Sequence, residues 1–456
     1  MDKNISNIIK IVKGRIEDPG KIALREIDTI VNAANPTLMG SDRGVDGCIH
    51  AAVKKCLNNG QTLAENICKE LDIKAGQIPG TEIKKKNSIR CNRGQAVMTG
   101  GYGLCENIIH VVGSQYDGMS KSGIDCSSSR IALLESCYFE IIKIVRENTG
   151  IRNIAIPVIG AGDYDFPFKL AVKIALASIG NALAEWKNED EELFAMSSLD
   201  NIYFYIYDDN AEECKKNFKI ANRVFNKYKP LFREDRKVVF QNSFMAHMRY
   251  LNEIIRYDKK RGYFATARLI RILLMAVRFL FMPVMLIKDV RGTVDWEKRR
   301  RVVERLALAK VALPVIFWMF WNYGFFIQNM TLHEIVFPGI IIYSISDTIT
   351  YLMTLILMAD IQRPSANIIR SMIMLLVNYI EVSLGMSYLY FINYKNIILL
   401  NDAVQFGVLG TVSDKVTIGK TADYAFLYAD AAIKFFFASL VFGYFANHMK
   451  QRRFRS

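Results

Sequence analysis

Short apolar runs alternate with helical patterns over the first half of the chain. Six runs have the length and the β-branched content of buried strands, at 8–12, 27–31, 95–99, 108–112, 154–157 and 202–207. Stretches with helical spacing of apolar positions lie between or after them, at 44–57, 62–71, 126–147, 167–186 and 210–226. This alternation predicts a three-layer α/β/α sandwich, in which helices cover both faces of a mixed sheet.

The second half of the chain has a different pattern, which predicts an all-α membrane domain over residues 272–456. Four apolar segments are long enough to cross a bilayer, at 306–328, 335–359, 368–391 and 425–447. A fifth, 272–287, is shorter and contains Arg278. On a helix, Arg278 would form a basic stripe with Arg261, Arg268 and Arg271, opposite an apolar face. Such a stripe favours a helix that lies in the membrane interface over one that spans the bilayer. Residues 229–271 are polar and basic, and are expected to be a partly helical juxtamembrane connector after a soluble domain at 1–228.

The two halves of the chain differ in net charge. Residues 1–228 contain 29 basic and 29 acidic side chains, so the whole net charge of +14 lies beyond residue 228. Basic residues beside apolar spans indicate contact with anionic lipids of a bilayer, whereas the neutral soluble half argues against nucleic acid as a partner. The segment 288–305 holds seven Lys and Arg residues and should stay inside. Four crossings of a cell (inner) membrane, with both termini and the soluble domain cytoplasmic, satisfy this charge distribution.

The eight cysteines all lie between Cys48 and Cys214 and include no C-x-x-C pair. Reduced thiols in a cytosolic domain fit this distribution. No Cys and His residues cluster at the spacing of metal ligands, so neither a metal site nor a cofactor is expected.

Two glycine-containing turns carry the candidate chemistry. One follows the strand that ends in Asn32-Ala33-Ala34-Asn35 and leads to a helix at 45–50, and the other spans 157–164, again between a strand and a helix. Small side chains let backbone N–H groups approach an anion, and a helix N-terminus favours negative charge. Two such turns at the same ends of neighbouring strands predict a diphosphate clamp. Tyr164 offers a ring against which a ribose or a base can pack.

These segments resemble the macro domain family over about residues 8–226. The strand-Asn-Ala-Ala-Asn signature is at 30–35, Gly-Val-Asp-Gly with Ile-His is at 44–50, and Gly-x-Ala-x-x-Thr with Gly-Tyr-x-Leu is at 94–104. The strand Ile-Ile-His-Val-Val-Gly follows at 108–113 and the second glycine loop at 154–164. The resemblance implies a macro domain fold and binding of ADP-ribose, together with hydrolysis in one branch of the family.

The resemblance also implies site residues. The expected ligand-binding set is Ile16, Asn35, Gly44, Val45, Asp46, Gly47, Gly160, Ala161, Gly162, Asp163 and Tyr164. Asn35 would contact the ribose next to the second phosphate, and Asp46 matches an acidic position of the hydrolytic branch, so these two are the catalytic candidates. A structural alternative stays open for both, because Asn35 can cap a turn and Asp46 can favour a helix N-terminus. His50 and His110 are expected to be packed and hydrogen-bonded.

The chain departs from the family pattern at two places. Arg15 stands where the family has an Asp that reads the adenine amino group, and the run 40–44 contains Ser41, Asp42 and Arg43 where the family has glycines. The added charges favour a modified ADP-ribose or a different base.

Three functions remain open on this evidence. The first is a membrane sensor whose macro domain binds an ADP-ribose-derived signal. This domain plan is similar to that of the macro-plus-transmembrane effectors of bacterial Thoeris antiphage systems. Such a sensor could assemble into a homo-oligomer. The others are a membrane-tethered ADP-ribosyl hydrolase and an anchored reader of ADP-ribosylated proteins.

In the membrane half, the candidate functional residues are Asp347, Glu381 and Lys434, because charge within apolar spans usually faces a bundle interior or water. Segment 397–410 is either a re-entrant loop or an ordinary outer loop.

Overall fold

The computed structural model describes residues 3–57, 60–74, 88–292, 294–322, 331–362, 368–417 and 421–452. By their contacts the chain divides into two units. Unit 1 consists of Met1–Ile272 and Pro283–Arg299, and unit 2 consists of Leu273–Met282 and Arg300–Ser456.

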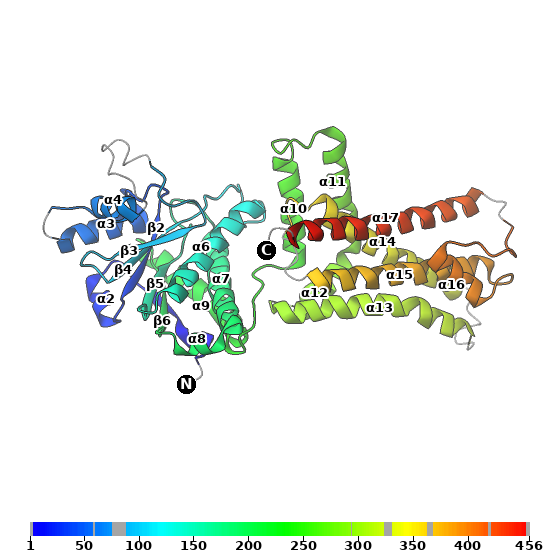
Figure 1. Ribbon diagram of the computed structural model, residues 1–456, viewed down its shortest axis with the longest axis horizontal. Helices are drawn as coiled ribbons and strands as arrows, with labels where there is room; N and C mark the ends of the chain where they lie inside the picture. The colour runs from blue at the N-terminus through cyan, green and yellow to red at the C-terminus, as the bar shows by residue number, and fades with distance from the viewer. Residues whose placement is uncertain are drawn as a thin grey trace. The chain divides into compact units, whose positions relative to one another are not determined.

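Unit 1 contains a six-stranded mixed sheet in the order β1-β6-β5-β2-β4-β3 (Figure 1). All neighbouring strands are parallel except β3 and β4. The strands are β1 (Ile9–Lys13), β2 (Thr29–Ala34), β3 (Ala96–Gly100), β4 (Asn107–Val112), β5 (Asn153–Pro157) and β6 (Asn201–Ile206). The six predicted strands are therefore confirmed, with small shifts in their bounds.

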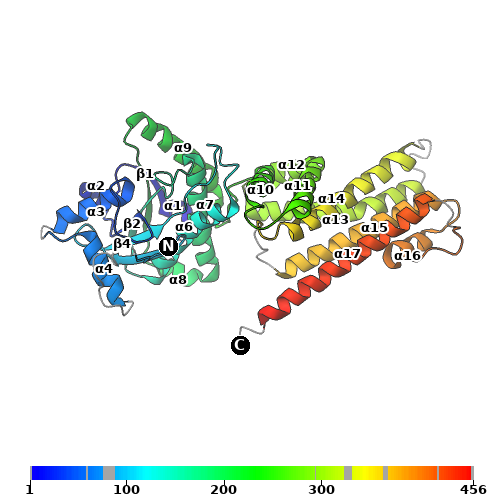
Figure 2. The ribbon, with the colours of Figure 1, turned by 90° about the horizontal axis from the view of Figure 1, so that it is seen from above.

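Helices cover both faces of this sheet, which confirms the predicted three-layer arrangement (Figures 1 and 2). One face carries α2 (Pro19–Leu24), α3 (Gly44–Leu57) and α4 (Leu63–Lys74), and the other carries α1 (Ile5–Ile8), α6 (Ser128–Glu147), α7 (Phe168–Glu189), α8 (Glu191–Met196) and α9 (Ala211–Arg233). Side chains alternate between the faces of a strand. Ile30 of β2 accordingly packs in the core beneath α3 and α4, and Val31 packs in the core beneath α6 and α7.

The segment predicted as a connector belongs by its contacts to the same unit as the sheet. It contains α10 (Ser243–Tyr257) and the first part of α11 (Ala265–Val277), and α12 (Met282–Gly292) joins them in unit 1. Asn242 caps α10 by accepting a hydrogen bond from the backbone N–H of Met245 at 2.8 Å. The contact boundary therefore differs from the boundary at residue 228 that the hydropathy pattern indicates.

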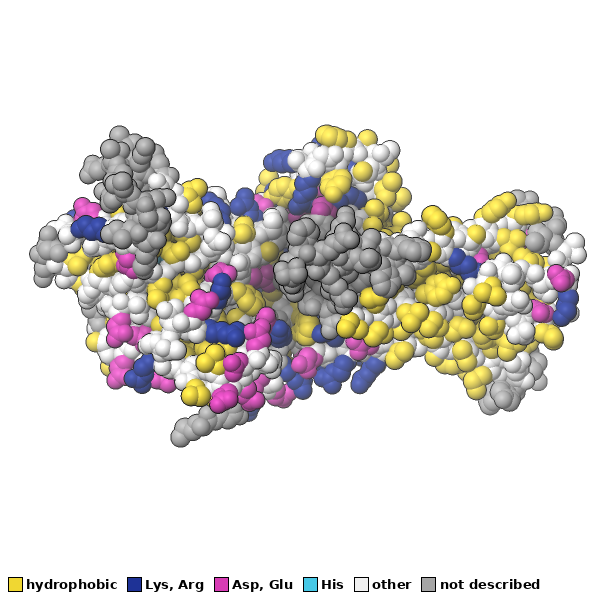
Figure 3. All heavy atoms as spheres, in the orientation of Figure 1, with side chains coloured by type: hydrophobic (Ala, Val, Ile, Leu, Met, Phe, Trp, Pro, Cys, Tyr) yellow, Lys and Arg dark blue, Asp and Glu magenta, His cyan; other side chains and the backbone are white. Residues whose placement is uncertain are grey.

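Unit 2 is all-helical. It holds η1 (Arg278–Phe281), most of α13 (Trp296–Asn322), η2 (Leu332–Val336), α14 (Phe337–Leu357), α15 (Ile368–Tyr394), α16 (Leu400–Leu409) and α17 (Thr421–Arg452). Figure 3 shows hydrophobic side chains gathered over its helices, and the exposed ones include Ile342, Ile373 and Leu376. The predicted loop at 397–410 contains helix α16, which ends at Gly410 in a left-handed conformation.

Three helices of the described chain are long and apolar enough to cross a membrane: Ala265–Gly292, Leu332–Leu357 and Ile369–Tyr394. The last two correspond to the predicted spans 335–359 and 368–391. Helices α13 and α17 occupy the predicted spans 306–328 and 425–447, but neither is among the three, and residues 323–328 lie outside the described residues. Four crossings therefore stay a prediction.

Half of the predicted basic stripe is packed inside the protein, whereas Arg261 is exposed and Arg268 is half-buried. Arg271 and Arg278 are buried. Nε of Arg271 lies 3.0 Å from the carboxylate of Asp258, and Arg278 donates a hydrogen bond of 2.6 Å to Asp347. Exposed apolar side chains of the same stretch include Leu269, Ile270, Leu273 and Leu280, and Arg291 near its end is exposed as well. The stripe therefore gives no support to the interfacial placement of 272–287, and that placement stays untested.

The close packing of α7 on α9 gives a test of the sandwich. A Cβ atom added at Gly180 of α7 would overlap the ring of Phe232, which is fully buried. We expect Gly180→Ala to lower the free energy of unfolding by about 1–3 kcal/mol, the usual cost of overpacking a core. Thermal unfolding of the purified protein measures the change. Gly150→Ala, where an added Cβ meets nothing within 4 Å, is the control. Equal melting temperatures for the two variants would contradict this packing.

Candidate functional site

The centre of the sheet opens between β2 and β5. These parallel strands pair only through Thr29 with Ile154 and Ile30 with Ala155, whereas β2 pairs with β4 along its whole length. Both strands end at the same edge, and each continues into one of the two predicted glycine turns. An edge where the carboxyl ends of parallel strands separate is the usual place for a ligand in an α/β sheet.

The two glycine turns meet at this edge. Gly44 begins α3 in a left-handed conformation with φ of 65°, and a Cβ added there would lie 3.4 Å from a carboxylate oxygen of Asp163. Gly44, Gly162 and Asp163 are exposed, and a Cβ at Gly162 would meet nothing within 4 Å. Open space therefore lies beside the second turn, next to the N-terminus of α3. A diphosphate is suited to such a place, because backbone N–H groups and the helix dipole favour an anion.

The second turn is held by its own backbone and by aromatic packing. Phe166 N–H donates to the carbonyl of Gly160 at 2.9 Å, and Asp165 N–H donates to that of Gly162 at 2.8 Å. Tyr164 is half-buried, and its carbonyl accepts from the backbone N–H of Tyr116 at 2.8 Å. The guanidinium of Arg93 lies 5.4 Å from the centre of the Tyr164 ring. Tyr164 is thus fixed in place beside the turn.

Asn35 holds the first turn. Its side-chain oxygen accepts hydrogen bonds from the backbone N–H groups of Thr37 (3.1 Å) and Leu38 (3.0 Å) and from the Thr37 hydroxyl (2.7 Å). Its amide donates to the carbonyl of Gly40 at 2.7 Å. The turn-capping alternative for Asn35 is therefore present in the structure, and contact between Asn35 and a ligand stays a prediction.

Asp46 points into the domain. It is 4% exposed, and one carboxylate oxygen accepts a hydrogen bond from the amide of Asn32 at 2.8 Å. The same oxygen lies 3.5 Å from Nε2 of His50, while the other oxygen has no hydrogen-bond partner among the described residues. Burial raises the pKa of Asp46 and lowers that of His50, and their attraction opposes both shifts. The carboxylate is thus one member of a buried polar group.

His110 completes this buried group. Its Nδ1 lies 3.2 Å from the Asn32 amide nitrogen, and its Nε2 lies 3.0 Å from the hydroxyl of Thr99. An amide nitrogen can only donate, so Nδ1 accepts and the proton is on Nε2. Burial lowers the pKa of His110 to about 3, which keeps the ring neutral. His110 is buried and hydrogen-bonded as expected, whereas His50 is half-buried and its Nε2 has no hydrogen-bond partner among the described residues. Asn32, which links His110 to Asp46, was not among the predicted site residues.

Charged and aromatic side chains gather where β1 and β6 end. The Arg15 guanidinium lies 4.9 Å from the centre of the Tyr207 ring and 3.3 Å from Glu17. Asp209 lies 3.8 Å from Arg15 and accepts a hydrogen bond from the Tyr207 hydroxyl at 2.8 Å. Ile16, predicted to bind ligand, has its side chain buried in the core. Sequence reasoning missed Tyr207, although its place directly after β6 is the signal that could have found it.

The remaining predicted site residues lie in the first turn of α3 and on the second glycine turn. Val45, Gly47 and Ala161 are half-buried and Gly160 is buried. Asp42 and Arg43, the departures from the family pattern, are exposed on the first turn. Within the described part of the chain, no group of three or more His, Cys, Asp or Glu side chains could hold a metal ion.

The charged candidates of unit 2 form two buried sets. Asp347 accepts hydrogen bonds from Arg278 at 2.6 Å and from Lys310 at 2.7 Å. Glu381 accepts from the hydroxyls of Ser344 and Thr348 at 2.7 and 2.8 Å, and lies 3.9 Å from Lys310. In the second set, Lys434 pairs with the buried carboxylate of Asp430 and donates to the carbonyl of Phe406 at 2.9 Å.

Comparison with known proteins agrees with this fold. The macro domain family pattern matches residues 31–175. The ADP-ribose glycohydrolase MACROD2 of Homo sapiens is 36% identical over 212 residues, which are 46% of this chain and 38% of that protein. The Mus musculus protein of the same name is 33% identical over 232 residues, 51% of this chain and 38% of that protein. The chain thus spans about two fifths of the length of these MACROD2 relatives.

Two further comparisons concern macro domains themselves. A macro domain-containing protein of Methanosarcina mazei is 33% identical over 206 residues, 45% of this chain and 86% of that protein. Among solved structures, the Oceanobacillus iheyensis macrodomain with ADP is 21% identical, and the match covers 50% of this chain and 95% of that one, with a TM-score of 0.31. The residues that match the family contain most of β2, all of β5 and both glycine turns. With a relative above 30% identity matched over most of its length, this chain belongs to the macro domain family.

Proposed function

We propose that this protein is a membrane-bound receptor. Its macro domain binds ADP-ribose or an ADP-ribose-derived nucleotide, and binding alters the helical unit so that the permeability of the membrane changes. The observation that carries the ligand part is the meeting of the two glycine turns at the opening between β2 and β5. The membrane part is supported by the three helices that are long and apolar enough to span a bilayer.

Arg15, just after β1, favours a ligand other than unmodified ADP-ribose. The family resemblance implies an Asp at this position that accepts a hydrogen bond from the adenine amino group. Arg15 offers only donors, and its guanidinium is balanced by Glu17 and Asp209. A base with an acceptor edge, or an added acidic group, matches Arg15 better than the adenine amino group does.

The buried charges of unit 2 support a function beyond anchoring. One apolar helix is enough for an anchor, and buried ion pairs contribute little net stability against an apolar replacement. Arg278, Lys310, Asp347 and Glu381 form such a set. We propose that this set belongs to the element that changes state when ligand binds.

A membrane-tethered ADP-ribosyl hydrolase is the second candidate. It is favoured by the similarity to proteins named ADP-ribose glycohydrolase. The inward direction of Asp46, which is hydrogen-bonded to Asn32, gives hydrolysis less support than binding has.

Ligand binding should depend on the open space at the second turn. Gly162→Glu places a carboxylate where the diphosphate would sit, and like-charge contact costs several kcal/mol, so affinity for ADP-ribose should fall about 100-fold. Calorimetry on the purified protein measures this. Gly150→Glu adds the same charge at another open position and should leave affinity unchanged. Equal affinity in the two variants would remove the turn from the site.

Arg15, which would face the base of the nucleotide, should control which nucleotide binds most tightly. Arg15→Asp replaces a donor with an acceptor for the adenine amino group, and a hydrogen bond to a charged group is worth about 1.5–3 kcal/mol. Affinity for unmodified ADP-ribose should rise about tenfold or more. Arg223→Asp makes the same charge change at an exposed position of α9, outside the site, and serves as control. If the two variants bind ADP-ribose equally well, Arg15 does not face the base.

The receptor proposal is tested with full-length protein in dye-loaded liposomes. ADP-ribose, its amino-acid conjugates and its cyclic forms are added at saturation, and leakage and conductance are recorded. At least one ligand should change permeability in the native protein and not in Gly162→Glu. Tight binding without any change in leakage or conductance would overturn the receptor. Steady release of ADP-ribose from modified protein, abolished in Asp46→Ala, would establish the hydrolase instead.

A further inference from the structure

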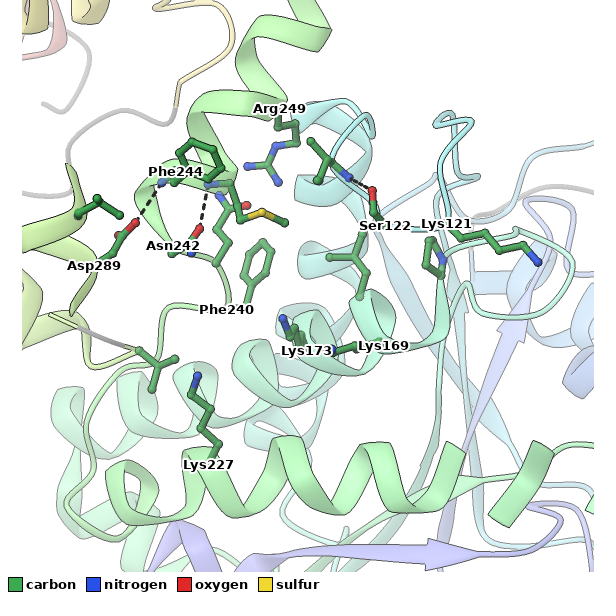
Figure 4. Close-up of a pocket in the computed structure, with 18 of the residues that line it drawn as sticks. Lys121, Ser122, Lys169, Lys173, Lys227, Phe240, Asn242, Phe244, Arg249 and Asp289 are labelled. Atoms are coloured by element: carbon green, nitrogen blue, oxygen red, sulfur yellow. Dashed lines mark hydrogen bonds between the residues drawn. The ribbon is translucent and has the colours of Figure 1, made fainter. Parts of the chain in front are cut away.

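A cavity lies within unit 1, lined by residues other than those of the glycine turns. Its volume is about 730 Å³, within the usual range of ligand pockets. Its walls come from the loop 121–124, the first turns of α7, Lys227 of α9, residues 240–249 and α12 (Figure 4). None of the residues that we assign to the nucleotide site lines it, so the two sites are separate in their residues.

The lining of this cavity is strongly basic. Five cationic side chains contribute to it: Lys121, Lys169, Lys173, Lys227 and Arg249. None of the four lysines forms an ion pair or a side-chain hydrogen bond with another described residue. Burial, followed by the positive charges of Lys169 and Lys227, lowers the pKa of Lys173. The lysines thus repel one another without a counter-charge.

The single acidic lining residue, Asp289, is already engaged. Its carboxylate accepts hydrogen bonds from the backbone N–H groups of Ser243 and Phe244 at 2.6 and 3.1 Å, at the start of α10. It also lies 3.3 Å from the guanidinium of Arg299. Figure 4 shows Asp289 directed toward the chain at Phe244, on a different wall from Lys169 and Lys173. Asp289 therefore does not neutralise the lysines.

Arg249 provides independent support for an anion in this cavity. It is only 6% exposed, it lines the cavity, and its Nε has no hydrogen-bond partner among the described residues. Nearby Glu253 is engaged elsewhere, because it accepts from Ser128 and pairs with Arg261. A buried guanidinium with an unpaired donor is costly, and an anion in the cavity would offset that cost.

The start of α7 adds a fixed partial positive charge. This helix of 22 residues begins after Pro167, which provides no side-chain cap, and both Pro167 and Lys169 line the cavity. Exposed N–H groups of a first turn bind phosphate well. Apolar side chains complete the lining, among them Leu170, Phe240, Phe244, Leu286 and Val290.

From this lining we propose that the cavity binds a phosphate group carried on an apolar or planar moiety. The phosphate contacts Lys173, Arg249 and the start of α7, and the rest of the ligand packs on the apolar wall. Because α7 and α10 line opposite parts of the cavity, the bound anion fixes α10 and α12 against the sandwich. The phosphate belongs either to a soluble compound or to a lipid headgroup, and the experiment distinguishes these sources.

The soluble source is tested by calorimetry of full-length protein with inorganic pyrophosphate. Lys173→Gln combined with Arg249→Gln should weaken pyrophosphate binding about tenfold or more, since charge-assisted hydrogen bonds are lost. Lys215→Gln combined with Lys219→Gln removes the same charge from α9 outside the cavity and should change nothing. Gly162→Glu should keep this binding while it loses ADP-ribose, which separates failure of this site from failure of the nucleotide site.

The lipid source is tested by native mass spectrometry of protein released from vesicles of phosphatidylglycerol and phosphatidylcholine. Retained phosphatidylglycerol that is lost in the Lys173 and Arg249 double variant would assign the site to a headgroup. The proposal is overturned if the double variant matches the Lys215 and Lys219 control in both experiments. It is also overturned if pyrophosphate binding disappears in Gly162→Glu alone, since the anion then binds only at the glycine turns.

Discussion

The short pairing between β2 and β5 is the constraint on which the proposed nucleotide site depends. The carboxylate of Asp28 holds the base of this pair by accepting from the backbone N–H groups of Arg152 (2.8 Å) and Asn153 (2.7 Å). Above it only two residue pairs form before the strands separate. Longer pairing would close the edge and bring the turns into direct contact. Shorter pairing would divide the sheet and its two cores.

Much of this arrangement follows from local sequence. Alternating apolar positions predict the strands, and the glycine-containing segments after Ala34 and Pro157 predict the turns, because both signals depend only on neighbouring residues. The inward direction of Asp46 does not follow, since it depends on Asn32 and on a neutral His110 from another strand. Helical spacing places Arg271 and Arg278 on one side of a helix. It gives no information on Asp258 and Asp347, the carboxylates that turn this side inward.

The charged side chains inside unit 2 follow a different physical rule from the exposed charges of unit 1. Arg278, Asp347 and Glu381 are buried and half-buried Lys310 lies beside the two carboxylates, so the set of two basic and two acidic side chains is formally neutral. An unpaired charge in an apolar environment would cost several kcal/mol. Movement of the η1 segment that carries Arg278 away from α14 must therefore be accompanied by a new partner or by water. That requirement favours discrete states over gradual displacement.

In the proposed receptor, the continuous helix between the two units would connect these states to ligand binding. The helical stretch Ala265–Gly292 begins and ends in unit 1, while its middle segment, Leu273–Met282, belongs to unit 2 and contains Arg278. A ligand can shift the equilibrium only by the difference in its affinity for the two states. A shift from equal populations to 100:1 needs about 2.7 kcal/mol, a small part of what a dinucleotide-sized ligand can supply. An anion in the cavity of unit 1 would act on the same stretch through Leu286 and Val290 of α12. Two ligands that both favour one placement of α12 would then bind cooperatively, each raising the affinity for the other by the same factor.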